Sequence, residues 1–269
     1  MEIQGLRLCY MDVGDGSPLV FLPPVSRALT HFGPNYQTFV NRYRVLALDL
    51  PGSGKSDKPI ACLYNVQFYV QMVLAWLNQL ELPPAVFVGN SLGGLLTLEI
   101  ARSRPAQARG LFLAAPAGHP PGLLRWLYGR FFLSPGRFQH LRPVEWRRMI
   151  GRNFATPPAE LEEIVQLAMA LSRSPEYPYY AAALVKGMKS ALQTNILPYL
   201  KEVTCPVHIV WGSADRVFPM VWLPDFLAAL PGSTGEVLSG CGHYPNIECA
   251  GAFDDALSRF IAGLEKAVV

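Results

Sequence analysis

The sequence predicts an α/β fold, with a mostly parallel, eight-stranded sheet flanked by helices and a helical cap inserted into it. Short apolar segments alternate with stretches of helical spacing, which is the pattern of a parallel sheet buried on both faces. One such segment, residues 85–88, leads directly into Gly-Asn-Ser-Leu-Gly at 89–93 and then into a helix-compatible stretch. Residues 118–196 interrupt the alternation, because their helical patterns have no strand candidates between them.

Each expected strand is an apolar run bounded by turn residues. The strand candidates are residues 6–13, 18–22, 43–48, 85–88, 110–115, 207–211 and 236–238. A crossover helix fits residues 31–42. Apolar side chains recur at helical spacing over 66–80, and this stripe ends before Pro83 and Pro84. The last expected helix carries one apolar face over 253–264.

The insertion divides the chain into a core, residues 1–117 and 197–269, and a helical cap, residues 118–196. The 269 residues are 51% hydrophobic and 16% charged, which is typical of a globular protein with a large core. A net charge of +3 is too small to indicate a nucleic-acid partner. The five cysteines show no CxxC spacing, and no secretory signal or bilayer-spanning apolar run is visible. We therefore expect a cytoplasmic protein with reduced thiols.

Ser91 is the candidate nucleophile. It follows an apolar strand and precedes a helix, which is the strand–turn–helix context of a nucleophile elbow. Such a turn is so tight that the residues two before and two after the serine must be small. Gly89 and Gly93 occupy those positions. The N-terminus of the following helix places partial positive charge where an oxyanion forms.

A serine hydroxyl needs a base to take its proton and a third group to orient that base. In hydrolases with this elbow, Ser, Asp or Glu, and His follow in that chain order. Asp215 lies after the 207–211 strand, and His243 lies after the 236–238 strand. Taken alone, Asp215 also fits a helix cap and His243 also fits an exposed loop histidine. Of the five histidines, His243 fits both the chain order and the position.

With these residues the chain resembles the α/β-hydrolase superfamily over nearly its whole length. The matching segments are the elbow at 89–94, the turn at 49–56, Trp-Gly-Ser-Ala-Asp at 211–215 and Gly-Cys-Gly-His at 240–243. The elbow looks like that of the meta-cleavage-product hydrolases, which break carbon–carbon bonds, and it is also similar to that of carboxylesterases. The resemblance implies hydrolysis through a Ser-His-Asp triad.

Two positions depart from the superfamily pattern. The family usually carries His-Gly-x after the third strand, with the amide of x completing the oxyanion hole, whereas this chain has Pro-Pro-Val at 23–25. Proline has no N–H, so Val25, or in second place Ser26, is expected to donate beside Leu92. Carbon–carbon hydrolases usually have a longer glycine-rich loop there and a Trp after the catalytic histidine, where this chain has Tyr244. We therefore favour an esterase.

The segment Gly-Ser-Gly-Lys-Ser at 52–56 is similar to part of a phosphate-binding loop. A Walker A motif needs a glycine five residues before the glycine of Gly-Lys-Ser. Asp49 holds that position, and its carboxylate would repel phosphate. We expect no nucleotide partner.

The first half of the cap combines arginines with aromatic residues, among them Trp126 and Phe132. One interpretation is an interfacial helix in weak contact with an anionic membrane surface. The other, which we favour, is a roof over the pocket whose arginines face water. Tyr180 belongs to a second aromatic cluster, which fits a substrate pocket or packing between cap and core. Trp126, Phe132, Tyr180 and Tyr244 are the expected substrate contacts.

These observations predict a hydrolase of small-molecule carboxylic esters with an apolar acyl or aryl part. Ser91 attacks the carbonyl, His243 acts as base and then acid, and Asp215 orients the imidazole. No cofactor and no metal are expected, because no cluster of His, Cys and Asp has ligand spacing. The alternatives are a carbon–carbon hydrolase, an acyltransferase on the same triad, and a binding module that kept the fold. The sequence does not predict the oligomeric state.

Overall fold

The computed structural model describes residues 1–119, 122 and 133–266. Over these residues the core is a seven-stranded sheet in the order β3-β5-β4-β6-β7-β8-β9. The strands are β3 (Tyr10–Val13), β4 (Pro18–Leu22), β5 (Arg44–Leu48), β6 (Ala85–Asn90), β7 (Ala108–Ala114), β8 (Val207–Gly212) and β9 (Thr234–Leu238). β3 pairs antiparallel with β5, and the other neighbouring pairs are parallel. This mostly parallel α/β arrangement confirms the predicted fold class.

The described sheet holds seven strands, one fewer than the eight expected. The beginning of the chain also departs from the single strand expected over 6–13. There β2 (Leu6–Arg7) pairs with β1 (Glu2–Ile3) in a separate two-stranded sheet, and only β3 joins the main sheet. Gln4 and Gly5 connect β1 to β2 with positive φ angles of 48° and 78°, which fold the chain back on itself. The residues of β2 are therefore paired outside the main sheet.

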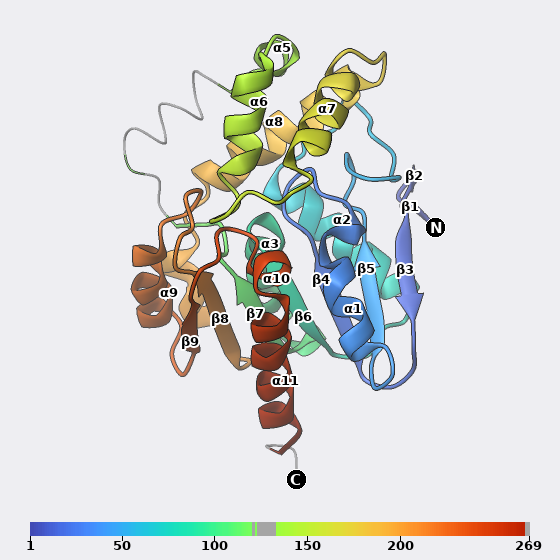
Figure 1. Ribbon diagram of the computed structural model, residues 1–269. Coiled ribbons are helices and arrows are strands. Elements are labelled where there is room, and N and C mark those ends of the chain that lie inside the picture. Colours follow the sequence, from blue (N-terminus) through green and yellow to red (C-terminus); the bar gives the residue numbers. More distant parts are fainter. Residues whose placement is uncertain (120–121, 123–132, 267–269) are drawn as a thin grey trace.

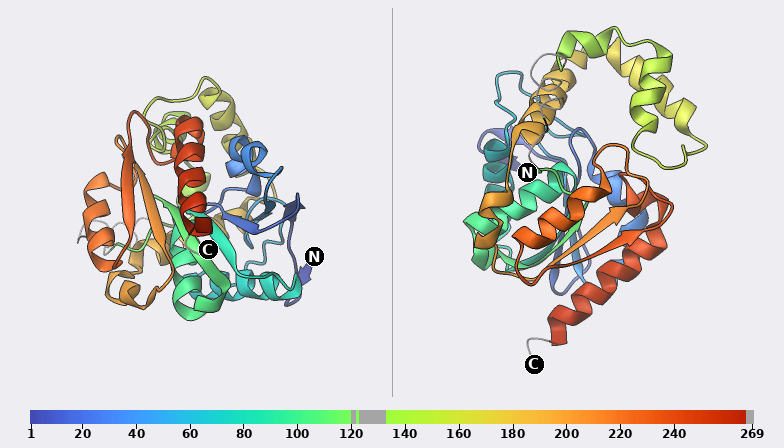
Figure 2. Two further views of the ribbon diagram at one scale, coloured as in Figure 1. Left: turned by 90° about the horizontal axis from the view of Figure 1, so that it is seen from below. Right: turned by 90° about the vertical axis from the view of Figure 1, so that its left-hand side faces the viewer.

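Two layers of helices cover the sheet (Figures 1 and 2): α1 (Gly33–Phe39) and α11 (Ala250–Lys266) on one face, and α2 (Val66–Gln79), α3 (Leu92–Ser103) and α9 (Leu223–Ala229) on the other. Successive residues of a strand pack alternately against one helix layer and the other. In β4, Leu19 and Phe21 pack in the cluster that contains the α1 and α11 side chains, whereas Val20 and Leu22 pack with those of α2 and α3. Burial on both faces explains why this strand is apolar throughout.

Short helical elements fill the connections: η1 (Leu29–Phe32), η2 (Pro105–Gln107), η4 (Leu197–Glu202), η5 (Met220–Trp222) and α10 (Pro245–Glu248). The crossover helix expected over 31–42 is shorter, because η1 precedes α1 and the helix ends at Phe39. Four strands, β4, β6, β8 and β9, run parallel within one sheet. The loops that follow them therefore lie at the same edge of the sheet. Within the described ranges, no helix is long and apolar enough to cross a membrane.

The described part of residues 118–196 contains four helices above this edge of the sheet (Figures 1 and 2): α5 (Pro135–Gln139), α6 (Pro143–Gly151), α7 (Leu161–Ser172) and α8 (Tyr177–Gln193). They pack around a cluster of their own that includes Trp146, Val165 and Ala181. The Ile196 N–H donates to the Gly118 carbonyl at 2.8 Å. This bond joins the two positions at which the sequence places the ends of the cap, although the domain boundaries themselves stay a prediction.

Candidate active site

Ser91 lies between β6 and α3 in a strained backbone conformation. Its φ is +55° and its ψ is −113°, a combination that residues with a side chain rarely adopt. The neighbouring glycines permit the turn. A Cβ on Gly89 would lie 2.6 Å from the Gly93 carbonyl, and one on Gly93 would overlap the carbonyl of Leu22 in β4. The two small residues are therefore required by backbone contacts within the elbow.

Asp215 and His243 form a buried hydrogen-bonded pair. His243 Nδ1 lies 2.8 Å from Asp215 Oδ2, and their side chains are 3% and 0% exposed. The other carboxylate oxygen, Oδ1, accepts hydrogen bonds from the backbone N–H groups of Val217 at 2.7 Å and Phe218 at 2.8 Å. Because a carboxylate only accepts, this contact selects the tautomer of the neutral imidazole that carries its proton on Nδ1 and its lone pair on Nε2. This is the tautomer that a general base needs.

The structure places Ser91 at the same edge of the sheet, with 7% of its surface exposed. Its Oγ makes no hydrogen bond with His243 Nε2 or with any other atom of the described residues. The hydrogen bond between a catalytic serine and its base is often long without substrate and shortens only when substrate binds. The two loops are nevertheless connected through the residue before the serine. Asn90 Nδ2 donates to the His243 carbonyl at 3.1 Å and to the Ala114 carbonyl at 2.9 Å.

Asn90 also joins a buried histidine that sequence reasoning did not assign to the site. His31 Nε2 lies 3.1 Å from Asn90 Oδ1, and the Asn246 side chain donates to the His31 carbonyl at 2.9 Å. Burial, and then the nearby Arg27, hold the pKa of His31 well below its ordinary value. His31 is therefore a neutral donor to Asn90. Adjacency to Ser91 is the only sequence signal that points to Asn90, and none points to His31.

The two expected oxyanion donors occupy suitable backbone positions. Leu92 begins α3, so its N–H has no acceptor within the helix. Arg27 N donates to Pro24 O at 3.1 Å, and Ser26 has a φ of +59°, which together define a tight turn around Val25. Among the described residues nothing accepts a hydrogen bond from the Val25 N–H. Both amides are free to donate, and their role as an oxyanion hole stays a prediction.

Tyr244 lies beside the Asp215–His243 pair. Its ring is 4.8 Å from that of His31 and 5.5 Å from that of His243, and Phe154 of the cap packs edge-on against it at 5.5 Å. The Arg27 guanidinium lies over the same ring, 5.4 Å from its centre. Tyr244 is thus next to the expected chemistry, but it is only 7% exposed. Its assignment to substrate binding stays a prediction.

Of the three other expected substrate contacts, Tyr180 is among the described residues, and Trp126 and Phe132 are not. The Tyr180 hydroxyl donates to Gly54 O at 3.1 Å, and Lys58 Nζ lies 4.7 Å from its ring centre. These contacts correspond to packing between cap and core, one of the two interpretations of this aromatic cluster. Trp126 and Phe132 lie outside the described residues, as does most of the basic aromatic segment considered for membrane contact.

The glycine-rich turn after β5 wraps around a carboxylate. Asp49 Oδ2 accepts from Lys55 N at 2.8 Å, and Asp49 Oδ1 accepts from Leu29 N at 2.5 Å. A Cβ on Gly54 would overlap the same carboxylate. Asp49 therefore occupies the space in which a phosphate-binding loop would hold its ligand. Over the described residues, no group of three His, Cys, Asp or Glu side chains is arranged to hold a metal ion.

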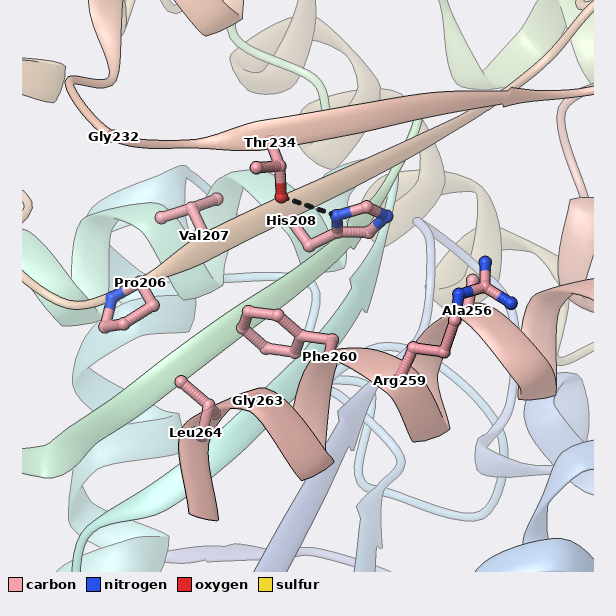
Figure 3. A pocket seen from close by; sticks show the side chains of 10 residues that line it. All are labelled: Pro206, Val207, His208, Gly232, Thr234, Ala256, Arg259, Phe260, Gly263 and Leu264. Atoms are coloured by element: carbon pink, nitrogen blue, oxygen red, sulfur yellow. Dashed lines mark hydrogen bonds between the residues drawn. The ribbon is translucent and has the colours of Figure 1, made fainter. Parts of the chain in front are cut away.

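A pocket of about 370 Å³ lies at the opposite edge of the sheet, where β8 and β9 begin (Figure 3). Its polar side chains bond to one another. His208 Nδ1 is 2.8 Å from Thr234 Oγ1, and Arg259 pairs with Glu236, which also contacts His208 at 3.2 Å. None of the expected catalytic residues lines it. This pocket is therefore separate from the candidate active site.

Comparison with known proteins bears on the family and the fold of the chain. Residues 17–256 match the model of the α/β hydrolase family. The chain is 26% identical over 280 residues to the 2-hydroxymuconate semialdehyde hydrolase of Pseudomonas sp. strain CF600, which covers 98% of this chain and 94% of that protein.

Two solved structures share the fold. A bacterial membrane phospholipase A has a TM-score of 0.85 at 22% identity, over 98% of this chain and 85% of that chain. A thermophilic esterase from Thermogutta terrifontis has a TM-score of 0.81 at 21% identity, over 96% and 94%. At these identities the two structures support the fold alone. Because the family model spans most of its length, the chain belongs to the α/β hydrolase family.

Proposed function

We propose that the protein is a serine hydrolase that cleaves carboxylic esters with an apolar acyl or aryl part. The observation that carries this proposal is the buried Asp215–His243 hydrogen bond at 2.8 Å, at the sheet edge where Ser91 has its strained φ of +55°. Backbone strain and a buried ionisable pair are costly, and they cluster at active sites. An esterase, an acyltransferase and a carbon–carbon hydrolase all need these three residues in this order, whereas a binding module that kept the fold does not.

The expected reaction has two steps. Ser91 Oγ attacks the ester carbonyl carbon while His243 Nε2 takes the hydroxyl proton, and the oxyanion accepts hydrogen bonds from the N–H groups of Leu92 and Val25. The bond to the leaving oxygen then breaks, and His243 returns the proton to the departing alcohol. Water attacks the acyl-enzyme with the same base, and the acid is released with Ser91 restored. Asp215 stays ionised and stabilises the imidazolium in both steps.

A series of nitrophenyl esters from acetate to dodecanoate tests the proposal. The protein should hydrolyse them with saturable kinetics, and the dependence on chain length should report the acyl preference. Ser91→Ala should lose on the order of 10⁴-fold in kcat, since only binding and the oxyanion donors remain. A folded Ser91→Ala variant with undiminished turnover would exclude Ser91 as the nucleophile. Added alcohols that divert the acyl group into a new ester would indicate an acyltransferase instead.

A carbon–carbon hydrolase is the second candidate. It is favoured by the relative named 2-hydroxymuconate semialdehyde hydrolase, which matches 98% of this chain, and by the similar elbow at 89–94. The prolines at positions 23 and 24 and Tyr244 after the histidine count against it. The coloured ring-fission product 2-hydroxymuconate semialdehyde is the discriminating substrate. If its colour is lost with a kcat/KM well above that for every ester in the series, the carbon–carbon reaction is the better description.

A further inference from the structure

One segment of the cap, residues 152–156 between α6 and α7, lies directly on the loop that carries His243. The His243 N–H donates to the Asn153 carbonyl at 2.8 Å. Asn153 lies two residues after the end of α6, and its side chain donates back to the Ile150 carbonyl of that helix at 2.9 Å. The backbone of the expected catalytic base is thus held by the segment that directly follows a cap helix.

The contact is too close for any side chain at Gly242. A Cβ at that position would lie 2.7 Å from Asn153 O, 2.8 Å from Ala155 N and 2.9 Å from Phe154 C. Phe154 is only 4% exposed, and its ring packs against Tyr244 at 5.5 Å. The cap segment therefore meets both neighbours of His243 in the chain.

The same segment also contacts the loop of the acid. Arg152 Nη2 donates to the Arg216 carbonyl, directly after Asp215, at 3.0 Å. The acid and base loops are joined to each other as well, since Ala214 N donates to Cys241 O at 3.0 Å. Residues 152–156 therefore contact both loops whose side chains form the buried pair.

Glu248 connects the two sides of this contact. Its Oε1 accepts from the cap amides of Ala155 at 2.8 Å and Thr156 at 3.3 Å, while its Oε2 accepts from the Gly242 amide at 2.6 Å. Hydrogen bonds to a carboxylate are stronger than those between neutral groups. No lysine or arginine of the described residues pairs with Glu248. Its carboxylate accepts from three backbone amides, two in the cap and that of Gly242, directly before the expected catalytic base.

We propose that Glu248 is a positioning residue that couples the seating of the cap to the alignment of His243. The proposal rests on the proposed function, because Glu248 acts through the base. When residues 152–156 are bound to the His243 loop, the backbone on each side of His243 is fixed. The imidazole is then held against Asp215 in the orientation that Ser91 requires. When the Glu248 bonds are lost, the cap segment and the base move together. A displacement of about 1 Å at a catalytic group can cost on the order of 10²-fold in rate.

The test compares Glu248→Gln and Glu248→Ala with the unmodified protein. Glutamine keeps the size of the side chain, but its NH₂ group must face an amide donor of either Gly242 or Ala155. Both variants should therefore lower kcat for nitrophenyl acetate on the order of tenfold or more, with KM within about twofold, because acetate is small and the binding groups remain. They should also slow the labelling of Ser91 by a fluorophosphonate in proportion.

Glu145→Gln is the matched control. Glu145 lies in the cap and, like Glu248, accepts from a backbone amide, but its partner, the Arg142 N–H at 2.8 Å, belongs to the same helix start. This variant should leave kcat unchanged. Hydrogen exchange of the peptide covering residues 150–158 supplies the structural readout, because exchange there should accelerate in Glu248→Gln and not in Glu145→Gln.

Each alternative result is decisive. Faster exchange with unchanged kcat would show that Glu248 seats the cap without positioning the base. A loss of activity that follows a lowered unfolding midpoint, and that disappears on cooling, would reduce Glu248 to a structural role. If the unmodified protein is inert to both the esters and the fluorophosphonate, the proposed function is wrong, and the positioning role is refuted with it.

Discussion

At the scale of single residues, the expected oxyanion hole is where the sequence departs most from the family pattern. Two prolines stand where an N–H would be expected, and the Val25 amide, in a tight turn closed by the 3.1 Å bond from Arg27 N to Pro24 O, is the nearest free donor. Val25→Pro removes this donor. The expected loss is on the order of 10²–10³ in kcat with little change in KM, because the bond strengthens in the transition state. Val25→Ala keeps the N–H and should cost far less in a steady-state ester assay. Full kcat in a folded Val25→Pro variant would transfer the role to Ser26.

His31 gives a residue-scale prediction about pH. Its pKa is lowered by burial in the folded protein, so the unfolded chain binds a proton below about pH 6.5 that the folded chain does not. The free energy of unfolding should therefore fall as the pH drops below that value, by at most ~1.4 kcal/mol per pH unit from this group. His31→Gln should flatten the profile measured by urea unfolding. His208, whose pKa burial also lowers, retains its share, and the exposed His140 is the control position. An unchanged slope in His31→Gln would mean that His31 is not kept neutral by the fold.

At the scale of elements, the elbow between β6 and α3 depends on backbone approach more than on helix propensity. Gly93→Ala brings a Cβ into the Leu22 carbonyl of β4. The new methyl group clashes with main-chain atoms, which cannot swing aside as a side chain can, so the unfolding free energy should fall by roughly 2 kcal/mol or more. Gly263→Ala is the control, since Gly263 lies within α11 with nothing within 4 Å of its Cβ direction. That change should be neutral or stabilising by up to ~1 kcal/mol. Similar midpoints for the two variants in thermal unfolding would contradict this account of the elbow.

Some elements of the molecule leave a pattern in the sequence, and the contacts between distant loops do not. Central strands such as β4 are apolar throughout because both faces are buried, and Gly-x-Ser-x-Gly reports a local steric need, so both leave a signal in neighbouring residues. The contacts around the base leave none. Asn90 meets His243 across 153 positions, and Glu248 meets Ala155 across 93. Single hydrogen bonds between distant loops have no period and no motif, so Asn90, His31 and Glu248 were not assigned roles. The hairpin at β1 and β2 was missed because Leu6 and Tyr10 fit one strand pattern as well as two.

At the scale of the whole molecule, the described structure is a sheet whose carboxyl edge gathers the loops of Ser91, Asp215 and His243, and a helical cap that contacts the core at several places. Among these are the neck, where Ile196 bonds to Gly118, the Tyr180–Gly54 bond, and the contact of residues 152–156 with the loops of Asp215 and His243. On the proposed function, we therefore infer that the core supplies the chemistry and that the cap supports the geometry of the base.

The central claim is that Ser91 is a nucleophile activated by His243 and Asp215, and covalent labelling measures it directly. A fluorophosphonate should add one phosphonyl group to the folded protein, and mass spectrometry of peptides should place it on Ser91. Ser91→Ala should not be labelled. Asp215→Asn should be labelled on the order of 10⁴-fold more slowly, because the amide favours the wrong tautomer of His243. Labelling at another residue, or labelling of Asp215→Asn at the rate of the unmodified protein, would contradict the account.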